Sequence, residues 1–372
     1  MKPGSHSKDI LNKSTNRKPK KKPVLGKRPV SGRQLRNRLI IIFGSIIFIL
    51  FIAVMFVIHT NPFRSVPEDL TITVAWSPGS TVDEMVRVLA REMDSHFTLS
   101  NISGANGANG ANAVFRSPHN GGNILATTLS SFVTSEAMGF ADSSHRDWET
   151  WLCAFSPAFI VVAYDSPYMT IHDLIAAIRD NPGTIRCADD GYGSIAFTAA
   201  ELFSSKTALE VSHVSFSGNT PAIDAVLDNN AEFAILLSTQ VINHLQAGLL
   251  RPLGVFRDAD FLLGGDTDII IPSIAGISDG LDALLPYGEY YGFFIPGNIP
   301  DEHFEIWDKM IKSAVASLTF TEFIRTAGIV PITPDRNSNS GIVERYSSVT
   351  NWTLYNAGFL PTNPDKLGIP SP

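Results

Sequence analysis

An uncharged run of twenty residues, from Leu39 to Ile58, constrains this chain more than any other feature of its sequence. An α-helix rises about 1.5 Å per residue, so such a run is long enough to span the roughly 30 Å hydrocarbon core of a bilayer. The apolar core of a cleaved signal peptide is shorter, about 7 to 15 residues, and precedes a small-residue cleavage site. Here Phe56, Val57 and Ile58 end the run and offer no such site. We therefore predict an uncleaved transmembrane helix over residues 39–58.

Positive charge is concentrated before this run. Thirteen Lys and Arg residues and a single acid, Asp9, precede it, whereas only Arg64 follows it closely. This asymmetry predicts a cytoplasmic N-terminus and a body on the other side of the membrane. Residues 1–38 contain almost no large apolar side chains, so we expect a basic, disordered cytoplasmic tail followed, after the helix, by a linker over residues 59–67.

The remaining body is acidic. The whole chain has 29 basic and 36 acidic residues, so 16 and 35 remain beyond residue 59, a formal charge of −19. Nucleic acid binding requires clustered Lys and Arg, so no nucleic acid partner is expected for the body. The basic tail lies directly before the apolar run, and we interpret it as a segment attracted to anionic lipid rather than to RNA.

Two cysteines, Cys153 and Cys187, are too few for a disulfide framework, and no Cys/His cluster indicates a metal site. We interpret them as buried thiols in strands and expect no bond between them, with a single disulfide as the alternative. The sequence predicts no metal and no cofactor.

Strand and helix patterns alternate along the body. Strands are predicted over residues 70–76, 123–129, 151–164, 184–188 and 211–216, and helices over 82–97 and 171–179, with further helices after the turns at 190–194 and 217–221. Alternation of this kind is typical of an α/β fold with a mainly parallel sheet covered on both faces. The length of the body predicts two such lobes.

Three turns rich in Gly, Ser and Asn each end a strand and open a helix: Ser77–Thr81, Asp190–Ser194 and Ser217–Thr220. In a parallel α/β sheet such turns lie at the carboxyl ends of the strands, where helix N-termini present unpaired N–H groups that suit a carboxylate or phosphate. Ordinary helix capping by Ser and Thr is the alternative for any one turn. Together with the Gly-Ala-Asn repeat at 104–112, the three turns indicate a binding cleft.

These turns resemble the receptor family of tripartite tricarboxylate transporters, the Bug-type extracytoplasmic solute-binding proteins. The family's P-G-G-x-x-D, N-x-x-G-A-G-G, G-x-G-S and Y-x-G-x-x-P-A motifs are matched by Pro78–Asp83, Asn101–Gly107, Gly191–Ser194 and Phe216–Ala222. Each motif is common alone, but the matches stand in the family's order and cover nearly all of residues 70–335. Ser80 replaces a family glycine and Phe197 a frequent histidine, so the ligand's identity stays open.

The resemblance implies a two-lobed periplasmic-binding-protein fold with crossovers near 163–165 and 290–294. Lobe 1 would comprise residues 68–164 and 292–372, and lobe 2 residues 165–291. It implies an extracytoplasmic receptor that captures a small organic anion of the carboxylate type for polytopic transporter subunits, without catalysis. The predicted anchor places this receptor on the cell membrane, whereas the family's usual receptor is cleaved and diffuses freely.

The resemblance also implies that backbone amides and hydroxyl groups of both lobes hold the ligand. The predicted ligand-binding residues are Trp76, Ser77, Pro78, Gly79, Ser80, Thr81, Asp83, Gly104, Asn106, Ser130, Gly191, Tyr192, Gly193, Ser194, Ser217, Gly218 and Asn219.

Two other functions are alternatives to a transport receptor. An enzyme is disfavoured because the sequence contains no G-x-S-x-G, H-E-x-x-H or G-x-x-x-x-G-K-[ST] motif, and because Asp189 and Asp190 are interpreted as turn and cap residues. A membrane-anchored ligand sensor that passes occupancy to a signalling partner is the alternative to a transport receptor. The tail of 38 residues is too short for a catalytic output domain, so a sensor would need that partner.

Overall fold

A computed structural model describes residues 32–59, 70–264 and 268–372, in two units, Met1–Arg64 and Ser65–Pro372. In the first unit, α1 runs from Gly32 to His59. It therefore begins inside the range expected to be a disordered tail, and residues 32–38 are helical. The remainder of the predicted tail, residues 1–31, and of the predicted linker, residues 60–67, lies outside the described residues.

Side chains of α1 are described at Arg36 and over residues 40–52. The large apolar side chains from Ile40 to Ile52 are 48–67% exposed. Over the residues described, no helix is long and apolar enough to cross a membrane. The anchor stays a prediction from the sequence.

The second unit, called the body here, is built on one long sheet. Among its described residues ten strands join in the order β2-β1-β3-β11-β4-β7-β5-β6, and β12 and β8 also pair with β4. The strands are β1 Leu70–Val74, β2 Phe97–Asn101, β3 Asn123–Thr128, β4 Trp148–Ala163, β5 Arg186–Asp189, β6 Ser212–Ser215, β7 Phe233–Leu237, β8 Leu250–Val255, β11 Gly288–Pro296 and β12 Val330–Pro331. A separate hairpin pairs β9 Phe261–Leu263 with β10 Ile269–Ile271.

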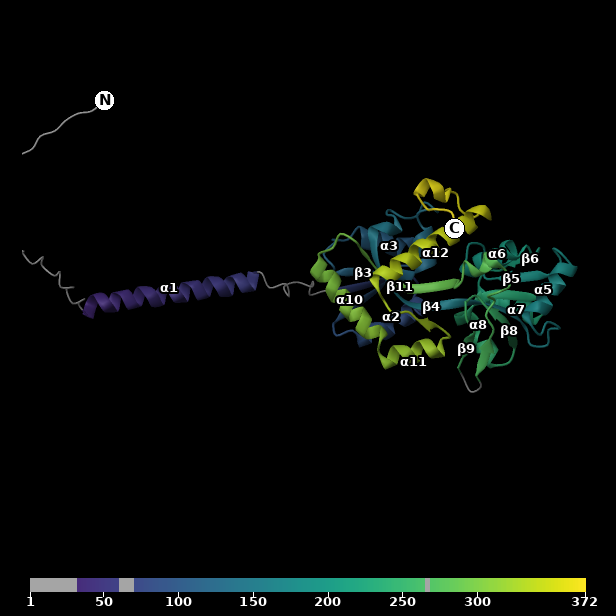
Figure 1. The fold of residues 1–372 in the computed structure, drawn as a ribbon, viewed down its shortest axis with the longest axis horizontal. Coiled ribbons are helices and arrows are strands. Elements are labelled where there is room, and N and C mark those ends of the chain that lie inside the picture. Colours follow the sequence, from purple (N-terminus) through teal and green to yellow (C-terminus); the bar gives the residue numbers. More distant parts are fainter. Residues whose placement is uncertain (1–31, 60–69, 265–267) are drawn as a thin grey trace, which may run out of the picture. The chain divides into compact units, whose positions relative to one another are not determined.

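Helices cover both faces of this sheet (Figure 1). They are α2 Thr81–Glu92, α3 Ala108–Phe115, α4 Leu129–Thr134, α5 Ile171–Asp180, α6 Ile195–Thr207, α7 Asn219–Leu227, α8 Ser238–Gln246, α9 Asp279–Asp282, α10 Asp301–Val315, α11 Leu318–Thr326 and α12 Arg336–Asn356, with 3-10 turns at Ala105–Gly107, His145–Asp147 and Pro364–Leu367. The predicted alternation of strands and helices is confirmed.

The two central strands decide the topology. Residues Trp148–Pro157 of β4 pair with β11, whereas Ala158–Ala163 pair with β7 and β8. β11 runs antiparallel to both β3 and β4, and β4 runs antiparallel to β7 and β8. The expectation of a mainly parallel sheet was therefore wrong, and the sheet is mixed. β4 carries the chain out of the first half of the sheet and β11 carries it back, so the two run in opposite directions (Figure 1). The lobe boundaries at 164/165 and 291/292 stay a prediction.

The helix α2 shows how the pattern builds the core. Its buried residues include Val82, Met85, Val86 and Leu89, a spacing of three and four that forms one apolar face. This face packs with α10, α11 and β1 in one cluster. The helix was predicted to extend to Phe97, but it ends at Glu92, because Phe97 begins β2 and pairs with Leu70 of β1.

Both cysteines are buried free thiols, Cys153 in β4 and Cys187 in β5. The interpretation of buried thiols in strands is confirmed.

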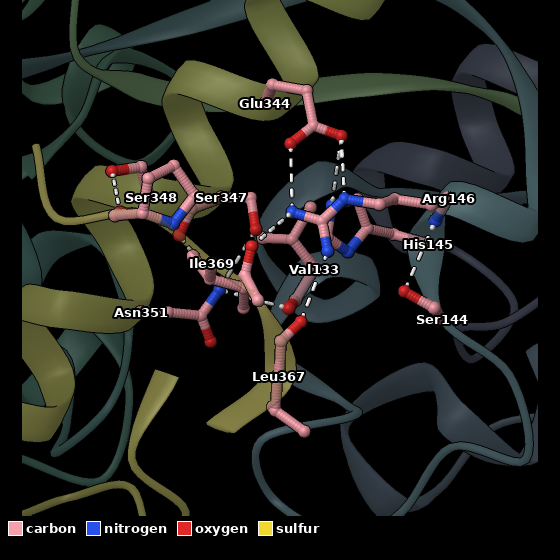
Figure 2. A network of polar contacts seen from close by, with 12 residues as sticks. Val133, Ser144, His145, Arg146, Glu344, Ser347, Ser348, Asn351, Leu367 and Ile369 are labelled. Carbon is pink, nitrogen blue, oxygen red and sulfur yellow. Dashed lines mark hydrogen bonds and ion pairs between the residues drawn. The ribbon is translucent and has the colours of Figure 1, made fainter. Parts of the chain in front are cut away.

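Polar contacts join α12 and the C-terminal segment to the rest of the body (Figure 2). The Arg146 guanidinium donates two hydrogen bonds to Glu344 of α12, at 3.1 and 3.2 Å, and one to the carbonyl of Leu367. Farther along α12, the amide of Asn351 donates to the carbonyl of Val133 at 3.1 Å. These contacts fix α12 against α4 and the turn at His145–Asp147.

Close approach of the central strands generates the first prediction. A Cβ atom on Gly292 of β11 would lie 2.3 Å from the carbonyl oxygen of Trp151 in β4. The backbone would have to move to remove this clash. We expect Gly292→Ala to lower the free energy of unfolding by about 1–3 kcal/mol. The matched control is Gly341→Ala on α12, where no atom lies within 4 Å of the added Cβ. It should raise stability by about 0.5–1 kcal/mol. Denaturant unfolding followed by circular dichroism measures both, and equal stabilities would contradict the prediction.

Candidate functional site

A cavity of about 290 Å³ lies in the body. Residues far apart in the sequence line it: Trp76, Ser80, Thr81, Val82, Asn106, Thr128, Ser130, Thr134, Asp190, Gly193, Ser194, Ile195, Leu237, Gln240, Glu289, Tyr291, Thr350 and Leu354. Small-molecule sites typically measure about 300–1,000 Å³, so this cavity suits a small ligand.

The helices α2, α6 and α8 begin at the cavity, as does the short α4, whose N-cap Thr128 lines it. Ser80 caps α2 by accepting a hydrogen bond from the Asp83 amide, and Ser194 caps α6 by accepting one from the Phe197 amide. α8 begins at Ser238, between the lining residues Leu237 and Gln240. The first N–H groups of a helix have no acceptor within it and carry partial positive charge, so this arrangement suits an anionic group.

The turn before α2 is held by a buried carboxylate. Asp83 is 2% exposed, and its side chain accepts hydrogen bonds from the Gly79 amide, from Arg87 and from Asn101, each at 2.9–3.0 Å. Burial raises the pKa of Asp83, but the hydrogen bonds from Arg87, Asn101 and Gly79 outweigh it and hold the pKa below its ordinary value. Asp83 thus positions the turn.

The turn before α6 contains two acids with different surroundings. The Asp189 carboxylate is buried and accepts from the Gly191 amide at 2.9 Å and from the Ser215 hydroxyl at 3.0 Å. Its neighbour Asp190 lines the cavity and accepts from Gln240 Nε2 at 2.6 Å. Asp189 therefore acts as the predicted turn residue, whereas Asp190 faces the site.

A second acid at the cavity, Glu289 of β11, is 5% exposed. The Ser130 amide donates to its Oε1 at 3.1 Å, and the Ser130 hydroxyl donates to its Oε2. Burial raises the pKa of Glu289 to about 8, against the lowering effect of hydrogen bonds from Ser130 and the Tyr290 amide. Burial therefore favours the neutral form of this carboxyl.

The structure brings together part of the predicted site. The predicted residues that line the cavity are Trp76, Ser80, Thr81, Asn106, Ser130, Gly193 and Ser194. Those outside its lining are Ser77, Pro78, Gly79, Asp83, Gly104, Gly191, Tyr192, Ser217, Gly218 and Asn219. Several of the latter shape the turns, as the positive φ angles of Gly79 and Gly191 show.

Sequence reasoning missed the lining residues that lie far from the turns, including Gln240, Glu289 and Thr350. For Glu289 a signal existed: it is the only charged residue in the strand Gly288–Pro296, whose residues are all buried. A single acid within such a strand is costly to bury and therefore indicates a function or a specific partner.

Comparison with known proteins identifies the family. Residues 82–348 match the tripartite tricarboxylate transporter family receptor. The chain belongs to this family. A relative, the UPF0065 protein in the tcbD-tcbE intergenic region of Pseudomonas sp. (strain P51), is 27% identical over 269 residues, covering 70% of this chain and 77% of that protein. The protein is therefore an extracytoplasmic solute-binding receptor and not an enzyme.

Solved structures show the same fold. A TctC solute-binding protein from Polaromonas superposes with a TM-score of 0.65 at 18% identity, covering 78% of this chain and all of that one. R. palustris Rpa4515 with adipate superposes with a TM-score of 0.62 at 20% identity, covering 80% and 99%. The predicted two-lobed periplasmic-binding-protein fold is confirmed.

The Asp83 network generates the second prediction. Asp83→Asn leaves at least one donor to this buried side chain unpaired and should lower stability at neutral pH by about 1–3 kcal/mol. Because the folded pKa is depressed, the contribution of Asp83 is present above the ordinary carboxyl pKa and is lost as pH falls through the folded value. Wild type and variant should therefore converge in thermal midpoint in acid. The control, Asp94→Asn at an exposed position just after α2, should change stability by less than about 0.5 kcal/mol. A gap that stays constant in acid would contradict the assigned role.

Proposed function

We propose that this receptor is anchored to the cell membrane by residues 39–58 and captures a small organic carboxylate for a transporter with polytopic membrane subunits. The observation that carries the proposal is the meeting of helix N-termini at one small cavity. We propose the seven predicted residues that line this cavity as its ligand-binding residues.

The capped first turn of α2 supports a carboxylate ligand. The Ser80 hydroxyl accepts a hydrogen bond from the Asp83 amide. The two helical N–H groups before it, those of Thr81 and Val82, belong to cavity-lining residues and are available to an acceptor on the ligand. Hydrogen bonds to a charged acceptor contribute about 1.5–3 kcal/mol each, so a few of them are compatible with micromolar binding after the costs of association. Adipate, bound by the similar R. palustris protein, is a ligand of this chemical class.

The uncharged run and the helix α1 support the anchor. The run extends through twenty residues without a charge, and α1 includes all of it in one continuous helix, Gly32–His59. The basic residues before it favour a cytoplasmic N-terminus.

The cavity proposal predicts that a bulky residue at position 81 blocks binding. Thr81 is the first residue of α2, is partly exposed and lines the cavity, so Thr81→Trp should fill the space without disturbing the core. We expect at least a roughly thirtyfold loss of affinity, about 2 kcal/mol, for whichever of succinate, glutarate, adipate or the corresponding ω-amino acids binds most tightly. Calorimetric titration of the full chain in detergent measures it. Glu84→Trp, on the exposed side of the same helix turn, is the control and should bind as wild type does. Unchanged affinity in a folded Thr81→Trp would place the ligand elsewhere.

The anchor proposal predicts a single-pass topology. Protease added to intact cells should digest the body and leave an N-terminal fragment protected, detected through an epitope placed before residue 2. In cells permeabilised with detergent the same epitope should be lost. A protected body in intact cells, or an epitope lost without detergent, would contradict the proposed orientation.

A further inference from the structure

The cavity lining is acidic. Among its described residues the acids are Asp190 and Glu289, and neither Lys nor Arg lines it. A ligand that is only a carboxylate, and above all a dicarboxylate, would bring its negative charge beside Asp190 and would oppose the ionisation of Glu289. Like charges within a poorly solvated site repel strongly. The lining therefore restricts the charge of the rest of the ligand, and not only the nature of its anionic end.

Asp190 and Glu289 differ in the hydrogen bonds that their carboxyl oxygens accept. Both oxygens of Glu289 accept hydrogen bonds from Ser130, while Asp190 Oδ2 accepts from Gln240. Asp190 Oδ1 is buried and has no hydrogen-bond partner within the described part of the chain. Buried carboxyl oxygens are nearly always paired, and an ammonium group offers three donors and a positive charge.

We propose that the ligand carries a cationic amino group as well as a carboxylate, and that the amino group binds between the carboxyl groups of Asp190 and Glu289. The carboxylate end of this amino carboxylate then lies at the N-terminus of α2, beside Thr81 and Val82. The inference rests on the proposed carboxylate-binding function and deepens it by naming the ligand class.

The surroundings of Glu289 make the proposal sensitive to pH. The titratable groups that face it among the described residues are Asp190, Tyr287, Tyr291 and Tyr346. Burial raises the pKa of each of these tyrosines above the ordinary value, so they stay neutral near pH 8. The Arg345 guanidinium, on α12, donates instead to the carbonyl of Leu285 and interacts with Tyr290. Ser156, opposite Glu289 on β4, has no charge.

The direction of the pH effect separates two ligand classes. Since the pKa of Glu289 is about 8 in the free protein, the carboxyl must lose its proton to pair with an ammonium group. Affinity for an amino carboxylate therefore rises with pH through this range, and binding near neutral pH releases a proton. A dicarboxylate would instead favour the protonated carboxyl, and its affinity would fall as pH rises.

The experiment compares succinate, glutarate and adipate with the ω-amino acid of the same chain length, by calorimetric titration of the full chain in detergent. We expect the amino member of the tightest pair to bind at least about tenfold more tightly near neutral pH, about 1.4 kcal/mol. Its affinity should rise about twentyfold between about pH 6.5 and about pH 8.5, as a carboxyl with this pKa ionises. Titrations in buffers of different ionisation enthalpy should show release of nearly one proton.

Variants assign the effect to the two acids. Asp190→Asn should reduce the preference for the amino member at least about tenfold, and Glu289→Gln should remove the pH dependence and the proton release. The control, Asp224→Asn at an exposed position on α7, should leave both unchanged. Circular dichroism confirms that each variant folds.

Three outcomes would overturn the proposal. Tighter binding of the dicarboxylate, with affinity that falls as pH rises, would show that the cavity accepts a dianion and would leave the proposed carboxylate-receptor function intact. A preference for the amino member that survives Asp190→Asn and Glu289→Gln would place the amino group elsewhere. Failure of every compound to bind would contradict the proposed function itself, and this inference would fail with it.

Discussion

The antiparallel pairing of β4 with β11 is the interaction on which the rest of the body depends. β4 is the one strand of the described sheet that pairs with both halves, with β11 before Ala158 and with β7 and β8 after it. Gly288 and Gly292 let β11 approach the β4 backbone more closely than a residue with a Cβ atom would allow. The turns before α2 and α6 reach the same cavity because this pair joins the two halves in one sheet, and Glu289 reaches it from β11 itself.

The same arrangement explains how an acidic protein can hold an anion. The chain beyond the apolar run has a formal charge of −19, so its long-range field does not attract negative ligands. Attraction must come from short-range donors, and the N-termini of α2, α6 and α8 at the cavity supply them. As proposed, Asp190 and Glu289 would then select the ligand, because they would disfavour a second negative charge at the place where a positive charge would be stabilised.

Comparison of the three predicted turns with the cavity lining shows how much of the site could be predicted from the sequence. Ser80 and Ser194 cap their helices, as the ordinary capping interpretation required, and they also line the cavity. The third turn has the same composition, yet Ser217, Gly218 and Asn219 lie outside the cavity lining. Composition gives a turn its conformation and its cap, but the direction in which the turn faces depends on where its strand lies in the sheet.

The sequence by itself determined the features that neighbouring residues decide. These are the long uncharged helix at 39–58, the alternating strands and helices, and the capped turns at Ser80 and Ser194. Their physical basis is local: apolar periodicity, side-chain caps and glycine φ angles act within a few residues. Only the tertiary structure decided that the sheet is mixed, that α2 ends where β2 begins to pair, and that Gln240 donates to Asp190 in a cavity shared with Glu289. Such contacts join residues that are distant in the sequence, such as Leu70 with Phe97 and Asp190 with Gln240, so they depend on how the strands are arranged in the sheet.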